Sequence, residues 1–115
     1  MYDKEGRERI FNLIEKNHIP GVLLVSGDWH GARGYTIERP SGYTFYEFQP
    51  ASLGGRPGAS QNIKNTLFAI AGQYAFGEFT FDTEKDDPTV TFRLILEDGT
   101  EHYKLTLARS QLRAK

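Results

Sequence analysis

The first apolar residues of the chain recur with helical spacing. Between Ile10 and Ile14 the apolar side chains form one stripe among Glu, Arg and Lys residues, as in a helix that turns one face toward a core. Asp3 is a suitable N-cap, and Asn17 suits a left-handed helix terminus. The pattern therefore predicts an amphipathic helix over 4–16.

The second apolar segment, 22–25, is unbroken and has the length of a strand. A strand that is apolar on both faces needs neighbouring strands and a covering layer on each side, as in an α/β sheet. Because only one helix is predicted, we expect a layer that should cover this strand to be missing from the chain.

The middle of the chain alternates between glycine-rich and apolar segments. Residues 27–42 are polar and rich in glycine, which predicts a loop, whereas 43–48 has the pattern of a strand. The glycine- and proline-rich stretch 49–64 predicts a long irregular segment. Residues 67–71 and 74–81 are apolar again, and a change of phase at Gly77 predicts a bulge before the acidic turn 82–87.

The end of the chain carries the clearest hairpin pattern. Asp98 and Gly99 favour a two-residue turn, in which case facing residues have numbers that sum to 197. Val90 then faces Leu107, and the apolar residues of 90–107 share one face with polar residues mostly on the other. The predicted fold is α+β: an N-terminal helix, a buried strand, then a mainly antiparallel sheet that ends in this hairpin.

Length and composition limit the classes of protein that fit. The 115 residues suffice for a single domain, 1–115. A net charge of −1 gives no basic surface for nucleic acid, and no run approaches the ~20 apolar residues that span a bilayer. The charged N-terminal residues have no export-signal pattern, and the cellular compartment stays open. Without cysteine, any metal must be bound by His, carboxylate or carbonyl groups.

Candidate chemistry follows directly on the predicted buried strand, where open α/β sheets bind ligands. Asp28 and His30 are two residues apart, so in an extended chain both side chains leave the same face and can converge on one metal ion. An oxygen and an imidazole suit divalent or trivalent metals that activate water. Two ligands do not hold a metal firmly, and the same residues also fit a plain turn in which Asp28 bonds backbone amides.

The run GVLLVSGDWHGARGYTIERPSGYTFYEFQPASLGG resembles the C-terminal portion of PhoD-like (alkaline phosphatase D type) metallophosphoesterases. It has the apolar strand, the Ser-Gly-Asp-x-His segment, a short loop, and an aromatic strand with Tyr46 and Glu47. The preceding helix and the closing strands are similar too, so the resemblance covers nearly all 115 residues.

The resemblance implies one half of a metallophosphoesterase α/β sandwich, with His30 as a metal ligand and Asp28 as a ligand or its support. Trp29 stands where Arg is common in the family. The family's earlier ligand segments have no counterpart in the chain, so most of the metal site is missing. Residues 28–31 also fit the first metal motif of metallophosphoesterases, but strands and glycines follow instead of the helix and second Gly-Asp motif that this alignment requires.

Other polar residues allow a functional or a structural interpretation. Glu47 is either a solvated carboxylate, which we favour, or a partner of the metal segment. Arginines in loops can bind a phosphate through two hydrogen bonds or can simply be solvated. Arg33 is the candidate for a phosphate contact. Arg39 and Arg56 also lie in glycine-rich segments and allow the same two interpretations. We expect no catalytic role for the two remaining histidines, His18 and His102.

Two functions follow from these observations. In the first, the chain is a fragment of a metal-dependent phosphatase or phosphodiesterase that hydrolyses phosphate esters by metal-activated water, with little activity alone. It then needs a missing N-terminal half or a homo-oligomer. In the second, it is a non-catalytic binding or oligomerisation module that retained the half-fold and buries its exposed sheet against a second copy or partner.

Overall fold

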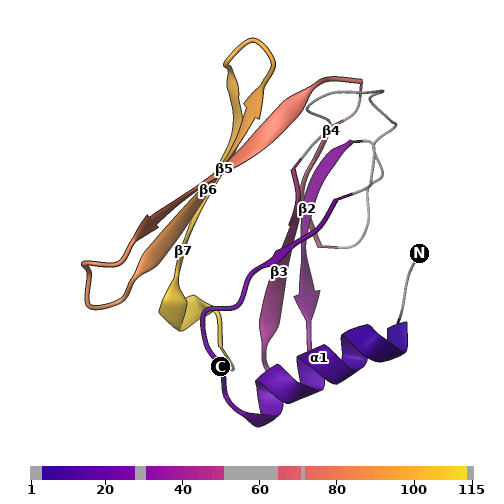
Figure 1. Cartoon of the computed structure of the whole chain (residues 1–115), viewed down its shortest axis with the longest axis vertical. Helices are drawn as coiled ribbons and strands as arrows, with labels where there is room; N and C mark the ends of the chain where they lie inside the picture. The colour runs from indigo at the N-terminus through magenta and orange to yellow at the C-terminus, as the bar shows by residue number, and fades with distance from the viewer. Residues whose placement is uncertain (1–3, 28–30, 51–64, 71, 114–115) are drawn as a thin grey trace.

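The computed structural model describes residues 4–27, 31–50, 65–70 and 72–113. They form an α+β fold with one helix and two sheets (Figure 1). The elements follow the chain in the order α1 (Lys4–Lys16), β1 (Leu24–Val25), β2 (Ala32–Glu38), β3 (Thr44–Gln49), β4 (Thr66–Ile70), β5 (Ala75–Asp82), β6 (Thr89–Leu96), β7 (Glu101–Ala108) and a short 3₁₀ turn (Arg109–Gln111).

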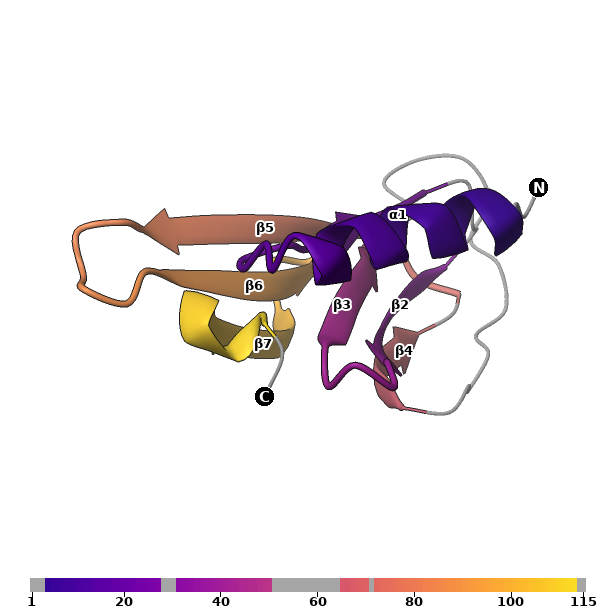
Figure 2. The same ribbon diagram turned by 90° about the horizontal axis from the view of Figure 1, so that it is seen from below.

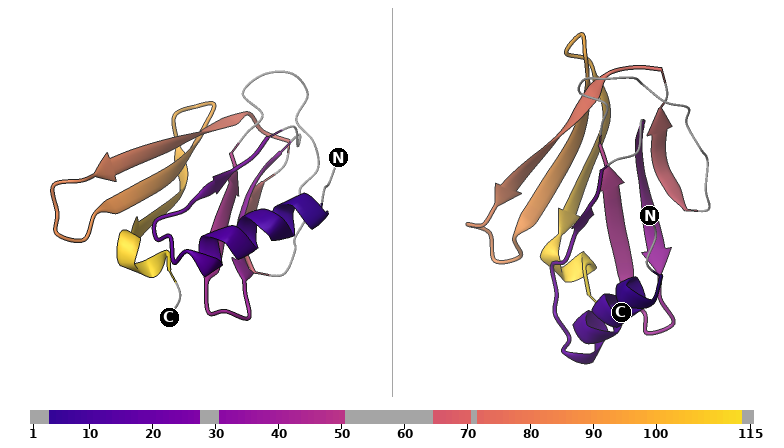
Figure 3. Two further views of the ribbon diagram at one scale, coloured as in Figure 1. Left: turned by 60° about the horizontal axis from the view of Figure 1, so that its bottom comes forward. Right: turned by 45° about the vertical axis from the view of Figure 1, so that its right-hand side comes forward.

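Strands β1 to β4 form one sheet in the order β1-β3-β2-β4, which we call sheet A. Only β1 and β3 pair in parallel there; the other pairs are antiparallel. Strands β5, β6 and β7 form the antiparallel sheet B, in chain order. The two sheets face each other, as the right-hand view of Figure 3 shows.

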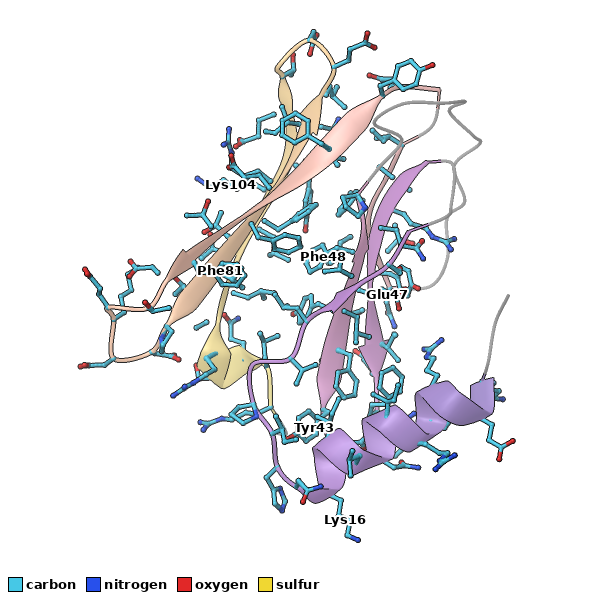
Figure 4. All side chains as sticks on the ribbon, in the orientation of Figure 1. Lys16, Tyr43, Glu47, Phe48, Phe81 and Lys104 are labelled. Carbon is cyan, nitrogen blue, oxygen red and sulfur yellow. The ribbon has the colours of Figure 1, made fainter. Side chains whose placement is uncertain are left out.

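The alternation of side chains along β3 assigns each face of sheet A to a different core. Phe48 points toward sheet B (Figure 4) and its ring lies 4.5 Å from that of Phe92, measured between centroids. Phe45, on the opposite face, stacks on Phe11 of α1 at 4.4 Å. Sheet A is therefore a middle layer, and α1 lies across β2 and β3 (Figure 2).

The predicted helix 4–16 is confirmed, because Phe11 and Ile14 are its buried residues. Its end differs by one residue from the prediction. His18, not Asn17, adopts the left-handed conformation, with φ of 52°, while the Asn17 side chain donates to the carbonyl of Leu13 at 2.8 Å.

The strand predicted at 22–25 is shorter and less buried than expected. Only Leu24 and Val25 pair, with β3 alone, and Val25 at this open edge is 61% exposed. The apolar run still contacts a core on each face: Leu23 packs toward sheet B, and Leu24 toward α1. The expectation that a covering layer is missing was wrong here, because sheet B supplies it.

The predicted loop 27–42 was also wrong in part, because it contains the central strand β2. Glycine obscured the strand pattern. Gly34 is needed there for packing, since a Cβ at this position would overlap the ring of Phe68 on β4. The β2–β4 register shifts beside it, between Gly34 and Tyr35.

No bulge occurs at Gly77, contrary to prediction. The β5–β6 register is continuous from Ala75 opposite Leu96 to Asp82 opposite Thr89. A Cβ at Gly77 would lie 2.6 Å from Pro50 and 2.7 Å from Phe92, so this glycine permits close packing of the two sheets. Most of the predicted irregular stretch, 51–64, lies outside the described residues.

The final hairpin has the predicted pairing but a different turn. Facing residues sum to 197 from Thr89–Ala108 to Leu94–Tyr103, as predicted. The turn, however, has three residues, because Leu96 donates to the carbonyl of Thr100 at 2.8 Å and Gly99 donates back to Leu96. A register shift between Leu94 and Ile95, which leaves His102 without a facing residue, compensates for the longer turn.

Candidate functional site

Polar side chains gather on the α1-facing side of sheet A, beyond the part that α1 covers. The register pairs Ile37 with Phe45, then Tyr35 with Glu47, then Arg33 with Gln49. Side chains two residues apart share a face, so this face changes from apolar to polar along β2 and β3. We call Ser26, Arg33, Tyr35, Glu47 and Gln49 the polar cluster.

The topology places the polar cluster at one edge of sheet A. Because β1 is parallel to β3 and β2 is antiparallel to it, the carboxyl ends of β1 and β3 and the start of β2 lie at the same edge. The backbone of Ser26 continues the pairing, since its N–H donates to the carbonyl of Phe48 at 3.0 Å.

Glu47 is the centre of the polar cluster. Its Oε2 accepts a hydrogen bond of 2.7 Å from the Ser26 hydroxyl and a longer contact of 3.4 Å from Gln49 Nε2. The Tyr35 hydroxyl also bonds to Glu47. The interpretation of Glu47 as a solvated carboxylate was therefore wrong: the pairing of β1 with β3 brings Ser26 to it, and Figure 4 shows it on β3 within sheet A.

Tyr35 is a hydrogen-bond donor over the whole physiological pH range. Burial, the hydrogen bond to Glu47 and the charge of Glu47 raise its pKa to about 12, against smaller opposing effects of Arg33 and Arg7. Each of the first three disfavours the phenolate. A phenol held in this way can donate to an anionic oxygen but does not serve as a base near neutral pH.

Arg33 lies in the polar cluster, as expected for a candidate phosphate contact. Its Nε donates to Oε1 of Gln49, and its guanidinium lies 5.6 Å from the Tyr35 ring centroid. Gln49 is 9% exposed, and its amide connects the arginine to Glu47. A cation, a phenol and a carboxylate thus occupy one hydrogen-bonded group.

The two predicted metal ligands, Asp28 and His30, lie outside the described residues. The residues on either side are described: Ser26 bonds to Glu47, and Ala32 is 1% exposed in the core between the sheets. Within the described ranges, no group of three or more His, Cys, Asp or Glu side chains is placed to hold a metal ion.

The other candidate residues lie away from the polar cluster or outside the described ranges. Arg39 binds Glu8 and Glu15, each at 2.8 Å, and connects the β2–β3 turn to α1. Arg56 is not among the described residues. His18 lies in the turn after α1 and His102 in the β7 bulge, and both are exposed.

Sequence reasoning did not identify Tyr35 and Gln49 as part of a site. The signal that could have found them is the alternation of Arg33, Tyr35 and Ile37 in a segment with only one glycine inside the strand. If this segment is taken as a strand that pairs with 44–49, its alternation places Tyr35 beside Glu47.

Comparisons with protein-family models, with curated proteins and with solved structures find no match to this chain. Among the described residues, no helix is both long and apolar enough to span a membrane.

Proposed function

We propose that the chain is the C-terminal part of a PhoD-like, metal-dependent phosphoester hydrolase. One observation carries the proposal: Ser26 bonds to Glu47 at the edge where β1 and β3 end, immediately before Asp28 and His30 in the sequence. The resemblance assigns metal binding to those two residues. Polar groups that can support a metal segment thus lie beside the end of β1, two residues before Asp28 in the sequence, which supports the proposal.

The described residues have distinct roles in this proposal. Arg33 supplies a guanidinium, whose N–H groups phosphate oxygens can accept. The Tyr35 hydroxyl donates its single proton to Glu47 and so helps to hold that carboxylate in place. Glu47 fixes Ser26 and thereby the start of the segment that carries Asp28 and His30. When bound, a divalent or trivalent metal supplies an activated water for attack on phosphorus. Further ligands have to come from outside the described residues, so we expect little hydrolysis by the chain alone.

Metal content tests this proposal. In equilibrium dialysis against zinc, manganese, calcium or iron, we expect the purified chain to bind metal weakly, as measured by mass spectrometry, and His30→Ala to reduce the bound amount at least tenfold. His102→Ala is the matched control, because it removes an exposed histidine of the β7 bulge. Equal metal content in both variants, or none in the parent chain, would contradict the proposal.

The alternative is a non-catalytic binding or oligomerisation module. The observation that favours it is the closed bonding of the polar cluster, in which Glu47 accepts from Ser26, Tyr35 and Gln49. A carboxylate with three donors has little need of a metal or ligand. A metal-free chain with an intact fold would select this alternative.

A further inference from the structure

Among the described residues, strand β5 is an edge of sheet B, and of the usual protections it carries only the acidic side chains of Glu78 and Asp82. Edge strands are commonly blunted by a bulge, a Pro or a Lys, because their free backbone groups pair readily with another chain. The opposite edge strand, β7, has a bulge at His102 and carries Lys104. By contrast, β5 pairs with β6 in continuous register over all eight residues and contains neither Pro nor Lys.

The hydrogen-bonding pattern identifies the free backbone groups of β5. Glu97 donates to the carbonyl of Tyr74 at 3.0 Å, so in the antiparallel ladder the even-numbered residues of this strand pair with β6. The odd-numbered residues, among them Gly77, Phe79 and Phe81, direct their N–H and C=O groups away from β6. Within the part of the chain that the structure describes, these groups have no backbone partner.

Apolar side chains accompany this free edge on both faces. Phe81 is 65% exposed and Phe76 is 42% exposed. Phe81 also lines an apolar cavity of about 130 Å³ together with Leu23, Val90 and Leu107. Figure 4 shows Phe81 on sheet B, away from α1. An edge with free backbone groups and exposed aromatic rings favours the addition of a strand.

We propose that β5 pairs antiparallel with β5 of a second copy, which joins the two copies of sheet B into one six-stranded sheet. A two-fold axis perpendicular to the sheet places the same face of both copies on the same side of the joined sheet. Odd-numbered residues of one copy therefore face odd-numbered residues of the other, and even-numbered residues face even-numbered ones. The residue that lies on the two-fold axis faces the same residue of the second copy and defines the register. With Glu78 on the axis, two Glu78 residues would face each other. With Thr80 on the axis, Glu78 would face Asp82. Like charges in facing positions are destabilising.

Placing Phe79 on the axis avoids both repulsions. Glu78 then faces Thr80 of the second copy, Phe76 faces Asp82, and Phe81 faces Gly77. The odd-numbered residues face one another in this register, so their free N–H and C=O groups pair. The acidic turn that follows β5, residues 83–87, lies at the far end of each strand, away from the same turn of the second copy.

Light scattering on the full chain tests self-association. We expect a mass twice the 13.0 kDa of one chain, and Phe81→Lys should reduce it to that of one chain, because a lysine at the edge blocks strand addition. The matched control is His102→Lys, which places the same charge on the opposite edge of sheet B and should leave the dimer intact. Phe81 is largely exposed, so Phe81→Lys should keep the circular-dichroism spectrum of the parent chain, and its thermal unfolding should no longer depend on protein concentration.

Cross-linking tests the register. The chain has no cysteine, so the double variant Glu78→Cys/Thr80→Cys should form a reducible covalent dimer, whereas Lys104→Cys on β7 should not. A chain that stays monomeric at millimolar concentration would overturn the proposal, as would a dimer that Phe81→Lys leaves unchanged. Because neither measurement uses metal, a failure here is distinguishable from a failure of the proposed hydrolase function.

Discussion

At the scale of single residues, the polar cluster shows how neighbours change the chemistry of ordinary side chains. The sequence predicted the strand that contains Glu47 but not the strands that pair with it, so Glu47 was expected in solvent. Pairing with β1 and β2 instead surrounds it with Ser26, Tyr35 and Gln49. The sequence could identify Asp28, His30 and Arg33 as candidates, since their residue types carry the signal. It could not identify Tyr35 or Gln49, since their role depends on which strand lies next to which.

The raised pKa of Tyr35 predicts a loss of stability in alkali. The folded-state value of about 12 exceeds the ordinary value of 10.0, so the unfolded chain releases this proton first as pH rises. The stabilisation is complete below pH 10 and is lost between pH 10 and 12. We expect the free energy of unfolding to fall less steeply with pH over this interval in Tyr35→Phe than in the parent chain.

Urea unfolding at a series of pH values measures this difference, and tyrosinate absorbance provides an independent reading. In the folded parent chain, one more tyrosine should titrate late than in Tyr35→Phe. Identical pH slopes for the two proteins would show that Glu47 and burial do not hold the Tyr35 proton.

Gly34 predicts a second effect that belongs to one residue. A methyl group there overlaps the Phe68 ring, whereas a Cβ at Gly27 meets no atom within 4 Å. We expect Gly34→Ala to reduce the free energy of unfolding by about 2 kcal/mol through overpacking, and Gly27→Ala to change it by less than about 0.5 kcal/mol. Chemical denaturation compares the two, and equal stabilities would mean that β4 moves aside without cost.

At the scale of secondary-structure elements, periodicity predicted what depends on local pattern. The stripe ending at Ile14 defined α1, and facing apolar pairs defined the body of the β6–β7 hairpin. The elements that were missed or misjudged depend on distant partners. Strand β2 contains a glycine that Phe68 requires, and the apolar run before Ser26 is covered by sheet B, which no local pattern specifies.

Arg39 holds α1 on sheet A and supports a prediction about that contact. Its side chain is 12% exposed, bonds to Glu8 and Glu15, and lies 5.0 Å from the Phe11 ring centroid. Arg39→Ala leaves Glu15 with little solvent and without its cation, so we expect a loss of about 2 kcal/mol in the free energy of unfolding.

Arg93→Ala is the control for this contact, because Arg93 also bonds to two glutamates but on the open face of sheet B. Its loss should cost less than about 1 kcal/mol. Guanidinium denaturation of both variants gives the comparison. If the two losses were equal, the burial of Arg39 against Phe11 would contribute nothing.

At the scale of the whole molecule, the described residues form three layers: α1, sheet A and sheet B. The α+β class was predictable, because one helical stripe precedes several strand patterns. The layering was not, since it depends on which face of each strand meets which core. In the proposed hydrolase, the polar face of sheet A would meet the remaining ligands. In the proposed dimer, β5 lies in the other sheet, so the two associations can occur together.

The strand orders of the two sheets differ in what they demand of a folding chain. In sheet B each strand pairs with the one that follows it, across turns of a few residues, so closing these contacts costs little conformational entropy. Sheet A requires β1 to reach past β2 to β3, and β2 to reach past β3 to β4. These two of its three pairings therefore join more distant segments and carry the larger loop-closure cost. We therefore expect sheet B, in the last third of the chain, to form before sheet A, and to offer the apolar face against which β2, β3 and β4 pack.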